Sequence, residues 1–289
     1  MIHPYAIGIK EYTFEANPES LSKEKINILK KYGVNRISLG VESTKDKVLN
    51  SLNRHHTFDD VKRCVDDLNS EGVSNYSFDL ILGCPNSTLK TIKEDIENIL
   101  SLNPKHISCY SLEIHKNTVL YNRGVKQKSD ELIRKYYDYI STRLKKENFI
   151  HYEVSNWAKE GFRSKHNITY WKNEEYYGIG LSAASYVNGR RNKNTRNLAK
   201  YLKNIYNDES IVISKEMDLN YYIMLSLRTN TGLSLSLIKK KYNIDLLKVK
   251  KEEIELNINN KFLLFDGNNL YPSESGMMVL DSIILSMLL

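Results

Sequence analysis

Residues 76–88 read YSFDLILGCPNST, in which a run of β-forming residues at 76–82 is followed by a glycine and a proline. Its length and its branched and aromatic residues are typical of a buried strand, and the glycine and proline mark the turn that follows. One acidic residue, Asp79, interrupts the run. A charged side chain that is buried in a strand must be paired or hydrogen-bonded, so we expect Asp79 to have a specific partner.

The pattern of this segment repeats on both sides of it. Other β-rich runs occupy residues 11–16, 36–41, 106–114 and 152–155. Segments with apolar residues three and four positions apart separate them, at residues 21–32, 58–69, 89–102 and 129–148. That spacing predicts amphipathic helices. Strands that alternate with helices predict right-handed βαβ crossovers and a parallel sheet, and therefore an α/β fold.

The last third of the chain has a different organisation. Residues 156–196 are loop-rich and contain many Gly, Asn, Tyr, Trp and His residues. From about residue 213 the pattern predicts three helices, a small hairpin that turns at residues 266–268, and a final helix. This order resembles a winged-helix module. We therefore predict two domains, residues 1–212 and residues 213–289.

The composition excludes several classes of protein. The 289 residues are 41% hydrophobic and 27% charged, with a net charge of +7, which is ordinary for a globular protein. No apolar run is suited to spanning a bilayer and the N-terminus has no secretory signal pattern, so we expect a cytoplasmic protein. The three cysteines, Cys64, Cys84 and Cys109, are well separated and form no CxxC group. We expect neither disulfides nor a metal centre from them.

Charged residues stand where the predicted strands run into their loops. Glu15 and Glu42 lie at the ends of the first two strands, Asp79 lies in the third, and Arg54 follows the second. Ligands of parallel βα folds bind at the C-terminal ends of the strands. We therefore expect these four side chains to converge on one rim, either as a ligand site or as a solvated charged edge.

Several longer phrases resemble one known family. GVNRISLGVES at residues 33–43 and FDLILGCPNST at 78–88 resemble the oxygen-independent coproporphyrinogen III oxidase family of radical-SAM proteins. YEVSNWA at residues 152–158 and HNITYW at 166–171 resemble the HemW branch, the heme chaperones. The resemblance runs in order from about residue 11 to residue 196, and the C-terminal part resembles the family's C-terminal domain.

The resemblance implies an incomplete (βα)6 barrel. In the family, a CxxxCxxC loop after the first strand binds a 4Fe–4S cluster whose fourth iron binds S-adenosylmethionine, and a GGGTP motif follows the second strand. Neither motif occurs here. The chain begins at what resembles the third strand, so we predict a partial barrel without its first units. A fragment, a misplaced start codon, a pseudogene remnant and a separate chain that supplies the first part all remain open as explanations.

Binding positions of the family carry over to the rim and to the HNITYW phrase. Glu15, Arg54 and Asp79 match positions that contact S-adenosylmethionine, and Glu42 stands where the family commonly has glutamine. A carboxylate still accepts hydrogen bonds from ribose hydroxyls, although it has no amide donor. The phrase is associated with heme in the chaperone branch, which implies that His166 binds heme, with Tyr170 and Trp171 as aromatic walls. Alternatively, the phrase only holds a loop and fills the side of the barrel.

Three functions follow from these features, and they leave open whether the chain is an enzyme. The first is a heme chaperone that binds heme or a porphyrin and passes it to an acceptor protein. The second is an oxygen-independent coproporphyrinogen III oxidase of porphyrin biosynthesis, which the missing cluster motif disfavours. The third is a nucleic-acid-binding winged-helix module that uses the lysines of residues 239–241 and 248–251. Neighbouring glutamates offset the second lysine group, which disfavours nucleic-acid binding. The chaperone-like phrases favour the first function over the second.

Overall fold

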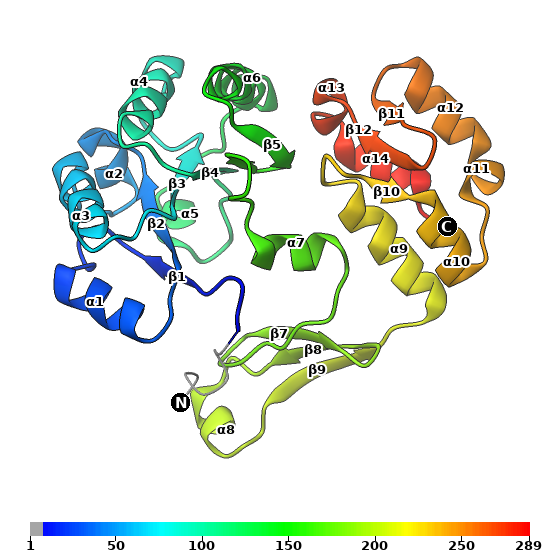
Figure 1. Ribbon diagram of the computed structural model, residues 1–289, viewed down its shortest axis with the longest axis horizontal. Coiled ribbons are helices and arrows are strands. Elements are labelled where there is room, and N and C mark those ends of the chain that lie inside the picture. The colour runs from blue at the N-terminus through cyan, green and yellow to red at the C-terminus, as the bar shows by residue number, and fades with distance from the viewer. Residues whose placement is uncertain (1–7) are drawn as a thin grey trace. The chain divides into compact units, whose positions relative to one another are not determined.

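The computed structural model describes residues 8–289, which form two compact units. The first unit ends at Arg163 and the second comprises Ser164–Leu289 (Figure 1). The predicted domain boundary after residue 212 falls within the second unit and stays a prediction. No helix in the described part of the chain combines the length and the apolar character that a membrane span requires.

The first unit is built on a six-stranded sheet. Its strands are β1 (Thr13–Ala16), β2 (Arg36–Glu42), β3 (Tyr76–Leu82), β4 (His106–Ser111), β5 (Ile150–Glu153) and β6 (Asn156–Ala158). They lie in the order β1-β2-β3-β4-β6-β5. The first four are parallel and adjacent in chain order, as the alternation of strand and helix patterns predicts.

The far edge of this sheet is antiparallel, so the prediction of a parallel sheet was wrong there. β6 pairs antiparallel with β4, and β5 pairs antiparallel with β6. Only Val154 and Ser155 connect β5 to β6. A connection of two residues can close an antiparallel hairpin but cannot make the crossover that parallel strands need. The predicted strand at residues 152–155 accordingly lies two residues earlier in the chain.

Helices connect these strands. They are α1 (Lys23–Lys31), α2 (Asp46–Ser51), α3 (Phe58–Ser70), α4 (Leu89–Leu100), α5 (Val119–Asn122) and α6 (Asp130–Lys146). All of them except α2 begin at a side-chain cap. Thr57 and Thr88 form capping boxes that start α3 and α4, and the Ser129 hydroxyl caps α6. These caps satisfy backbone N–H groups that the first helical turn leaves without partners.

The two faces of the sheet differ in chemistry because side chains alternate along a strand. On one face, Ile37, Phe78 and Ile107 are buried in a single core with apolar residues of α1, α3, α4 and α6. Cys64 and Cys109 belong to the same core, as expected of thiols that act as small hydrophobes. The other face carries polar side chains, namely Arg36, Ser38, Ser77, Asp79, His106 and Ser108. A ligand site is expected on this polar face.

The second unit begins with structure where the sequence predicted a loop-rich stretch. It contains α7 (Lys165–Trp171), β7 (Ala184–Val187), β8 (Arg190–Asn194), α8 (Leu198–Leu202) and β9 (Asn207–Val212). The three strands form an antiparallel sheet in the order β7-β8-β9. The loop prediction was wrong here because these strands are short and polar, so the alternation of apolar residues that marks a half-buried strand is weak.

The C-terminal part of this unit has helices, a hairpin and then helices again, but with four helices before the hairpin, where three were predicted, and two after it, where one was predicted. Its elements are α9 (Lys215–Ser226), β10 (Leu233–Ser234), α10 (Leu235–Tyr242), α11 (Leu246–Val249), α12 (Lys251–Asn259), β11 (Leu263–Phe265), β12 (Asn269–Pro272), α13 (Glu274–Met277) and α14 (Leu280–Met287). The predicted hairpin is confirmed, since β11 and β12 pair antiparallel. β10 pairs with the other side of β12, which makes a three-stranded sheet. The winged-helix description stays a prediction.

Candidate functional site

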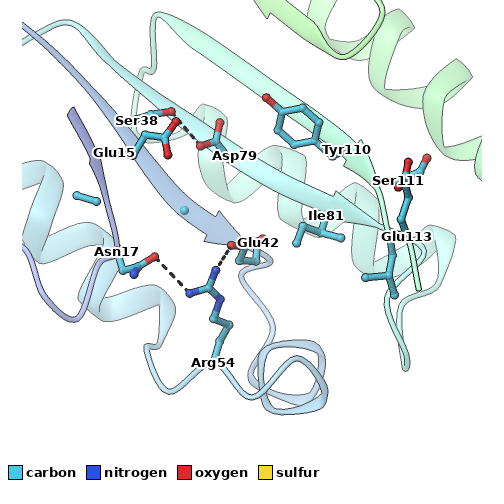
Figure 2. A pocket seen from close by; sticks show the side chains of 13 residues that line it. Glu15, Asn17, Ser38, Glu42, Arg54, Asp79, Ile81, Tyr110, Ser111 and Glu113 are labelled. Carbon is cyan, nitrogen blue, oxygen red and sulfur yellow. Dashed lines mark hydrogen bonds and ion pairs between the residues drawn. The ribbon is translucent and has the colours of Figure 1, made fainter. Parts of the chain in front are cut away.

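A pocket of about 660 Å³ lies at the C-terminal ends of the parallel strands of the first unit. Its lining includes Glu15, Glu42, Arg54 and Asp79, so the structure brings together all four residues of the predicted rim (Figure 2). Three different strands and the loop before α3 supply them. The parallel topology explains this convergence, because it places the carboxyl ends of neighbouring strands at one edge of the sheet.

Glu42 and Arg54 form an ion pair on the pocket wall. Arg54 Nη2 lies 2.6 Å from Glu42 Oε1, and Arg54 Nη1 donates to Asn17 Oδ1 at 3.3 Å. A β-carbon added to Gly40 would lie 3.3 Å from both of those acceptor oxygens, so glycine at this position leaves room for them. Burial raises the pKa of Glu42, and the neighbouring Arg54 offsets part of that rise.

The backbone of Glu42 adopts an uncommon conformation. Its φ is 62°, in the left-handed region, and the register of β2 against β3 shifts between Gly40 and Glu42. The next two residues are fixed by Asp95 of α4, which is 3% exposed. Asp95 accepts from the Ser43 hydroxyl at 2.9 Å and from the Thr44 backbone N–H at 2.7 Å. This anchor holds the strained residue so that its carboxylate faces the pocket.

Asp79 has the partners that its place in a strand demands. The Ser38 hydroxyl donates to Asp79 Oδ2 at 2.9 Å, and Ser38 also shares a hydrogen bond of 2.8 Å with Ser77. Arg36 Nη2 donates to the Ser77 hydroxyl at 2.9 Å. Burial raises the pKa of Asp79, while hydrogen bonds from Ser108 and Ser38 lower it in part. The predicted pairing of this carboxyl group is therefore confirmed.

The opposite wall of the pocket was not predicted from the sequence. Tyr110, Ser111, Leu112 and Glu113 of β4 and the loop after it line this side. Desolvation raises the pKa of Tyr110 to about 12, although 43% of the residue is exposed. The sequence contained a signal for Tyr110. It stands two residues after Ser108, so both side chains lie on the same polar face of the strand.

The three cysteines have the character of core residues. All are buried and none forms a disulfide. Burial raises the pKa of Cys84 to about 12 and raises those of Cys64 and Cys109 as well. Thiols with such pKa values are poor metal ligands and weak nucleophiles at neutral pH. Within residues 8–289, no group of three His, Cys, Asp or Glu side chains is arranged to hold a metal ion.

His166 lies in the second unit, on helix α7 and not in the predicted loop. Ser164 caps this helix, and the imidazole, which is exposed, occupies its first turn. The His166 ring meets the Tyr170 ring edge-on at 4.7 Å between centroids, and Tyr170 meets Tyr176 edge-on at 4.4 Å. Tyr176 was missed by the sequence reasoning, because only the backbone path after α7 brings it to this row of rings.

Trp171, the other aromatic residue of the phrase, does not belong to that row of rings. Its indole Nε1 is buried and has no hydrogen-bond partner among residues 8–289. The aromatic wall expected beside His166 therefore consists of Tyr170 and Tyr176. Spacing explains this, since residues four apart on a helix lie on one face and residues five apart do not.

Comparison with known proteins identifies the family. The model of the radical SAM superfamily matches residues 2–99, and that of the HemN C-terminal domain matches residues 213–279. The heme chaperone HemW of Lactococcus lactis is 38% identical, over 93% of this chain and 73% of that protein. The heme chaperone HemW of Bacillus subtilis is 36% identical, over 82% of this chain and 65% of that protein.

Among solved structures, coproporphyrinogen III oxidase (HemN) from Escherichia coli, described as a radical SAM enzyme, has a similar fold. The TM-score is 0.82, over 96% of this chain and 69% of that one. The sequence identity of 16% means that this likeness concerns the fold alone. It confirms the predicted α/β radical-SAM fold. Taken with the identity to the curated relatives, the α/β sheet and the C-terminal domain show that this chain belongs to the HemW family of heme chaperones within the radical SAM superfamily.

Proposed function

We propose that this protein is a heme chaperone that binds heme through His166 and hands it to an acceptor protein in the cytoplasm. The observation that supports this most directly is the row of rings formed by His166, Tyr170 and Tyr176. A neutral imidazole is a common axial ligand of heme iron. Tyrosine rings offer apolar surface for a porphyrin face at small conformational cost.

A hemin titration of the full chain, followed by the Soret band, tests this proposal. His166→Ala should bind hemin at least about tenfold more weakly, with a Soret maximum that differs from that of the wild type. His115→Ala is the matched control, because His115 is also exposed, with 72% of its side chain accessible. Equal affinity and identical spectra for wild type and His166→Ala would refute His166 as the ligand.

The pH dependence of binding supplies a second check. A protonated imidazole has no lone pair for iron, so protons and iron compete for the ring nitrogen. Hemin binding to the wild type should therefore weaken as the pH falls from 8 to 5.5, while the residual binding of His166→Ala should change less. Parallel pH profiles for the two proteins would contradict imidazole ligation.

We also propose that the pocket of the first unit binds S-adenosylmethionine. The ligand carries a sulfonium and an ammonium group, and the carboxylates Glu15, Asp79 and Glu113 on the pocket lining suit those positive charges. Glu42 can accept hydrogen bonds from ribose hydroxyls. Equilibrium dialysis with radiolabelled S-adenosylmethionine tests this. Asp79→Asn should bind the ligand more weakly than the wild type. Glu94→Gln, a substitution at an exposed residue of α4, should bind it equally well.

A 4Fe–4S cluster does not fit the residues of this chain. Such a cluster needs converging thiolates, whereas Cys64, Cys84 and Cys109 are buried thiols whose pKa values burial raises. These residues therefore do not support a radical step. The oxidase alternative requires such a step. The similarity that supports this alternative is one of fold.

The nucleic-acid alternative has less support, because several of its lysines have acidic neighbours. Lys241 is engaged by Asp218 at 2.7 Å. Lys248, Lys250 and Lys251 each lie within 4 Å of an acidic residue three or four positions away on the chain. Each neighbouring carboxylate lowers the net positive charge that these helices present to a phosphate backbone. The basic pattern of the sequence is therefore better explained as solvated helix faces.

A further inference from the structure

The carboxylate of Asp218, in the first turn of α9, is the centre of a hydrogen-bond cluster in the second unit. Its Oδ1 accepts from Asn173 Nδ2 at 2.8 Å and from the Tyr186 hydroxyl at 2.8 Å. Its Oδ2 accepts from the Tyr242 hydroxyl at 2.8 Å and lies 2.7 Å from Lys241 Nζ. Only 14% of the Asp218 side chain is exposed.

The four donors come from three separate parts of the unit. Asn173 lies just beyond the end of α7, Tyr186 belongs to β7, and Lys241 and Tyr242 form the last turn of α10. One carboxylate thus ties the helix that carries His166 to the C-terminal helices. Hydrogen bonds to an ionised group are shorter and stronger than neutral ones, so this tie is among the firmer polar contacts of the unit.

Asn173 is itself held on both sides of its amide. It is 8% exposed and has a φ of 54°, which asparagine tolerates better than most residues. Its Nδ2 donates to Asp218, and its Oδ1 accepts from Arg191 Nη2 at 2.6 Å. The Arg191 guanidinium lies over the Tyr221 ring at 4.0 Å and is fixed there by a cation–π contact. The side chain of Asn173 therefore has a single orientation.

Asn173 also determines where α7 ends. Asn173 N donates to the Tyr170 carbonyl at 2.9 Å, so the same residue closes the helix and binds Asp218. A helix as short as α7, Lys165–Trp171, is not stable by itself, and tertiary contacts must set its direction. Although burial alone would raise the pKa of Asp218, hydrogen bonds from Lys241, Tyr242 and Tyr186 hold it below its ordinary value, which keeps the anchor charged.

We propose that Asp218 is a positioning residue for the His166 site. By holding Asn173 it fixes the C-terminal end of α7, and so it sets how His166 and Tyr170 are presented relative to the C-terminal helices. This inference rests on the proposed heme binding at His166 and adds to it a dependence on a residue of the HemN-type C-terminal domain. Loss of the anchor should leave the imidazole present but misdirected.

The test uses the full chain with Asp218→Asn and Asn173→Ala, and with Asp281→Asn as control. Asp281 is an acidic residue of α14 whose side chain is 82% exposed and which pairs only with Arg228 among the ion pairs of the described chain. Both anchor variants should weaken hemin binding by at least about fivefold, the lower range of coupling between sites. At saturating hemin, their Soret spectrum should shift toward that of His166→Ala. The control should match the wild type.

The Soret spectrum at saturation separates positioning from a merely structural role. A variant that only unfolds more often would bind less hemin, but its bound form would keep the wild-type spectrum. Wild-type affinity and a wild-type spectrum in both anchor variants would overturn the proposal, and so would weaker binding with an unchanged spectrum.

Hydrogen exchange without hemin keeps this inference distinct from the heme proposal. Amides of residues 165–173 should exchange faster in Asp218→Asn, while those of α12 and α14 keep their wild-type rates. If the wild type binds no hemin, the heme proposal fails, and this exchange pattern still decides whether Asp218 fixes α7. Unchanged exchange at residues 165–173, or equal acceleration throughout the unit, would refute the anchor.

Discussion

Arg54 Nη2 and Glu42 Oε1 lie 2.6 Å apart in the pocket of the first unit, and this pair joins the loop before α3 to the strained end of β2. Only 8% of the Glu42 side chain is exposed, against 33% for Arg54. The charge of the carboxylate is therefore stabilised mainly by the arginine, whereas water also stabilises the charge of the arginine. A buried charge whose partner is removed is costly, because its lost hydration is no longer compensated.

Arg54→Met should lower the free energy of unfolding by about 1–2 kcal/mol, less than for a fully buried pair because Arg54 is partly solvated. Urea unfolding at pH 7 measures this. The double variant Arg54→Met/Glu42→Gln should recover most of the loss, since it leaves no charge behind. Arg134→Met, which removes an exposed partner 3.9 Å from Asp138, should change stability by less than about 0.5 kcal/mol. Equal losses in Arg54→Met and Arg134→Met would contradict the prediction.

Stability should fall with rising pH because of Glu153. This residue is 0% exposed, and burial raises its pKa from 4.5 to about 7. A raised pKa means that the folded state holds its proton longer than the unfolded state. The contribution to stability is therefore fully present below pH 4.5 and is lost as the pH rises through about 7.

Glu153→Gln tests this dependence, because the amide cannot ionise. Between pH 5.5 and 8.5 the wild type should lose about 2 kcal/mol more unfolding free energy than Glu153→Gln. Glu160→Gln, a change at an exposed glutamate of the same unit, should retain the wild-type slope. A Glu153→Gln protein whose pH slope equals that of the wild type would show that Glu153 is ionised in the folded state at all these pH values.

The chain by itself should bind no stoichiometric 4Fe–4S cluster. Its three thiols are buried, and a thiol with a pKa of about 12 is about 0.01% ionised at pH 8. Anaerobic reconstitution followed by iron, sulfide and EPR analysis checks the prediction. In parallel, a thiol reagent should react slowly with the native chain and rapidly with all three cysteines in urea. A stoichiometric cluster that Cys84→Ala abolishes would overturn it.

Strand β1 should make the isolated chain self-associate. Among residues 8–289, β1 pairs only with β2, so its other edge has no strand beside it. Next to that edge, Phe14 is 43% and Ile28 55% exposed, and both line an apolar pocket of about 370 Å³. Open edges flanked by apolar surface favour pairing with another chain.

Sedimentation velocity measures this association. Phe14→Lys should shift the wild-type distribution toward monomer, because a charge at an edge strand opposes pairing. Leu285→Lys places the same charge on α14, where the leucine is 71% exposed, and should leave the distribution unchanged. A wild type that sediments as a monodisperse monomer would contradict the prediction.

The main elements of the first unit were predictable because local periodicity controls them. β3 has the predicted bounds, and α3 and α4 begin at the predicted residues, since their apolar faces repeat at the helical period and threonine caps start them. The convergence of Glu15, Glu42, Arg54 and Asp79 was also predictable, because parallel strands present their carboxyl ends together. The antiparallel β5–β6 hairpin was not, because its direction depends on a two-residue turn and on pairing with β4.

The sequence by itself determined the family, the α/β fold and the set of charged residues at the strand ends, because these depend on residue types and on their spacing along the chain. Only the tertiary structure decided which residues are in contact with one another. Three contacts join distant segments of the chain: Asp95 with the residues that follow the left-handed Glu42, Tyr176 with Tyr170, and Asn173 with Asp218. No periodic pattern encodes such contacts, since they form only after packing has brought distant segments together.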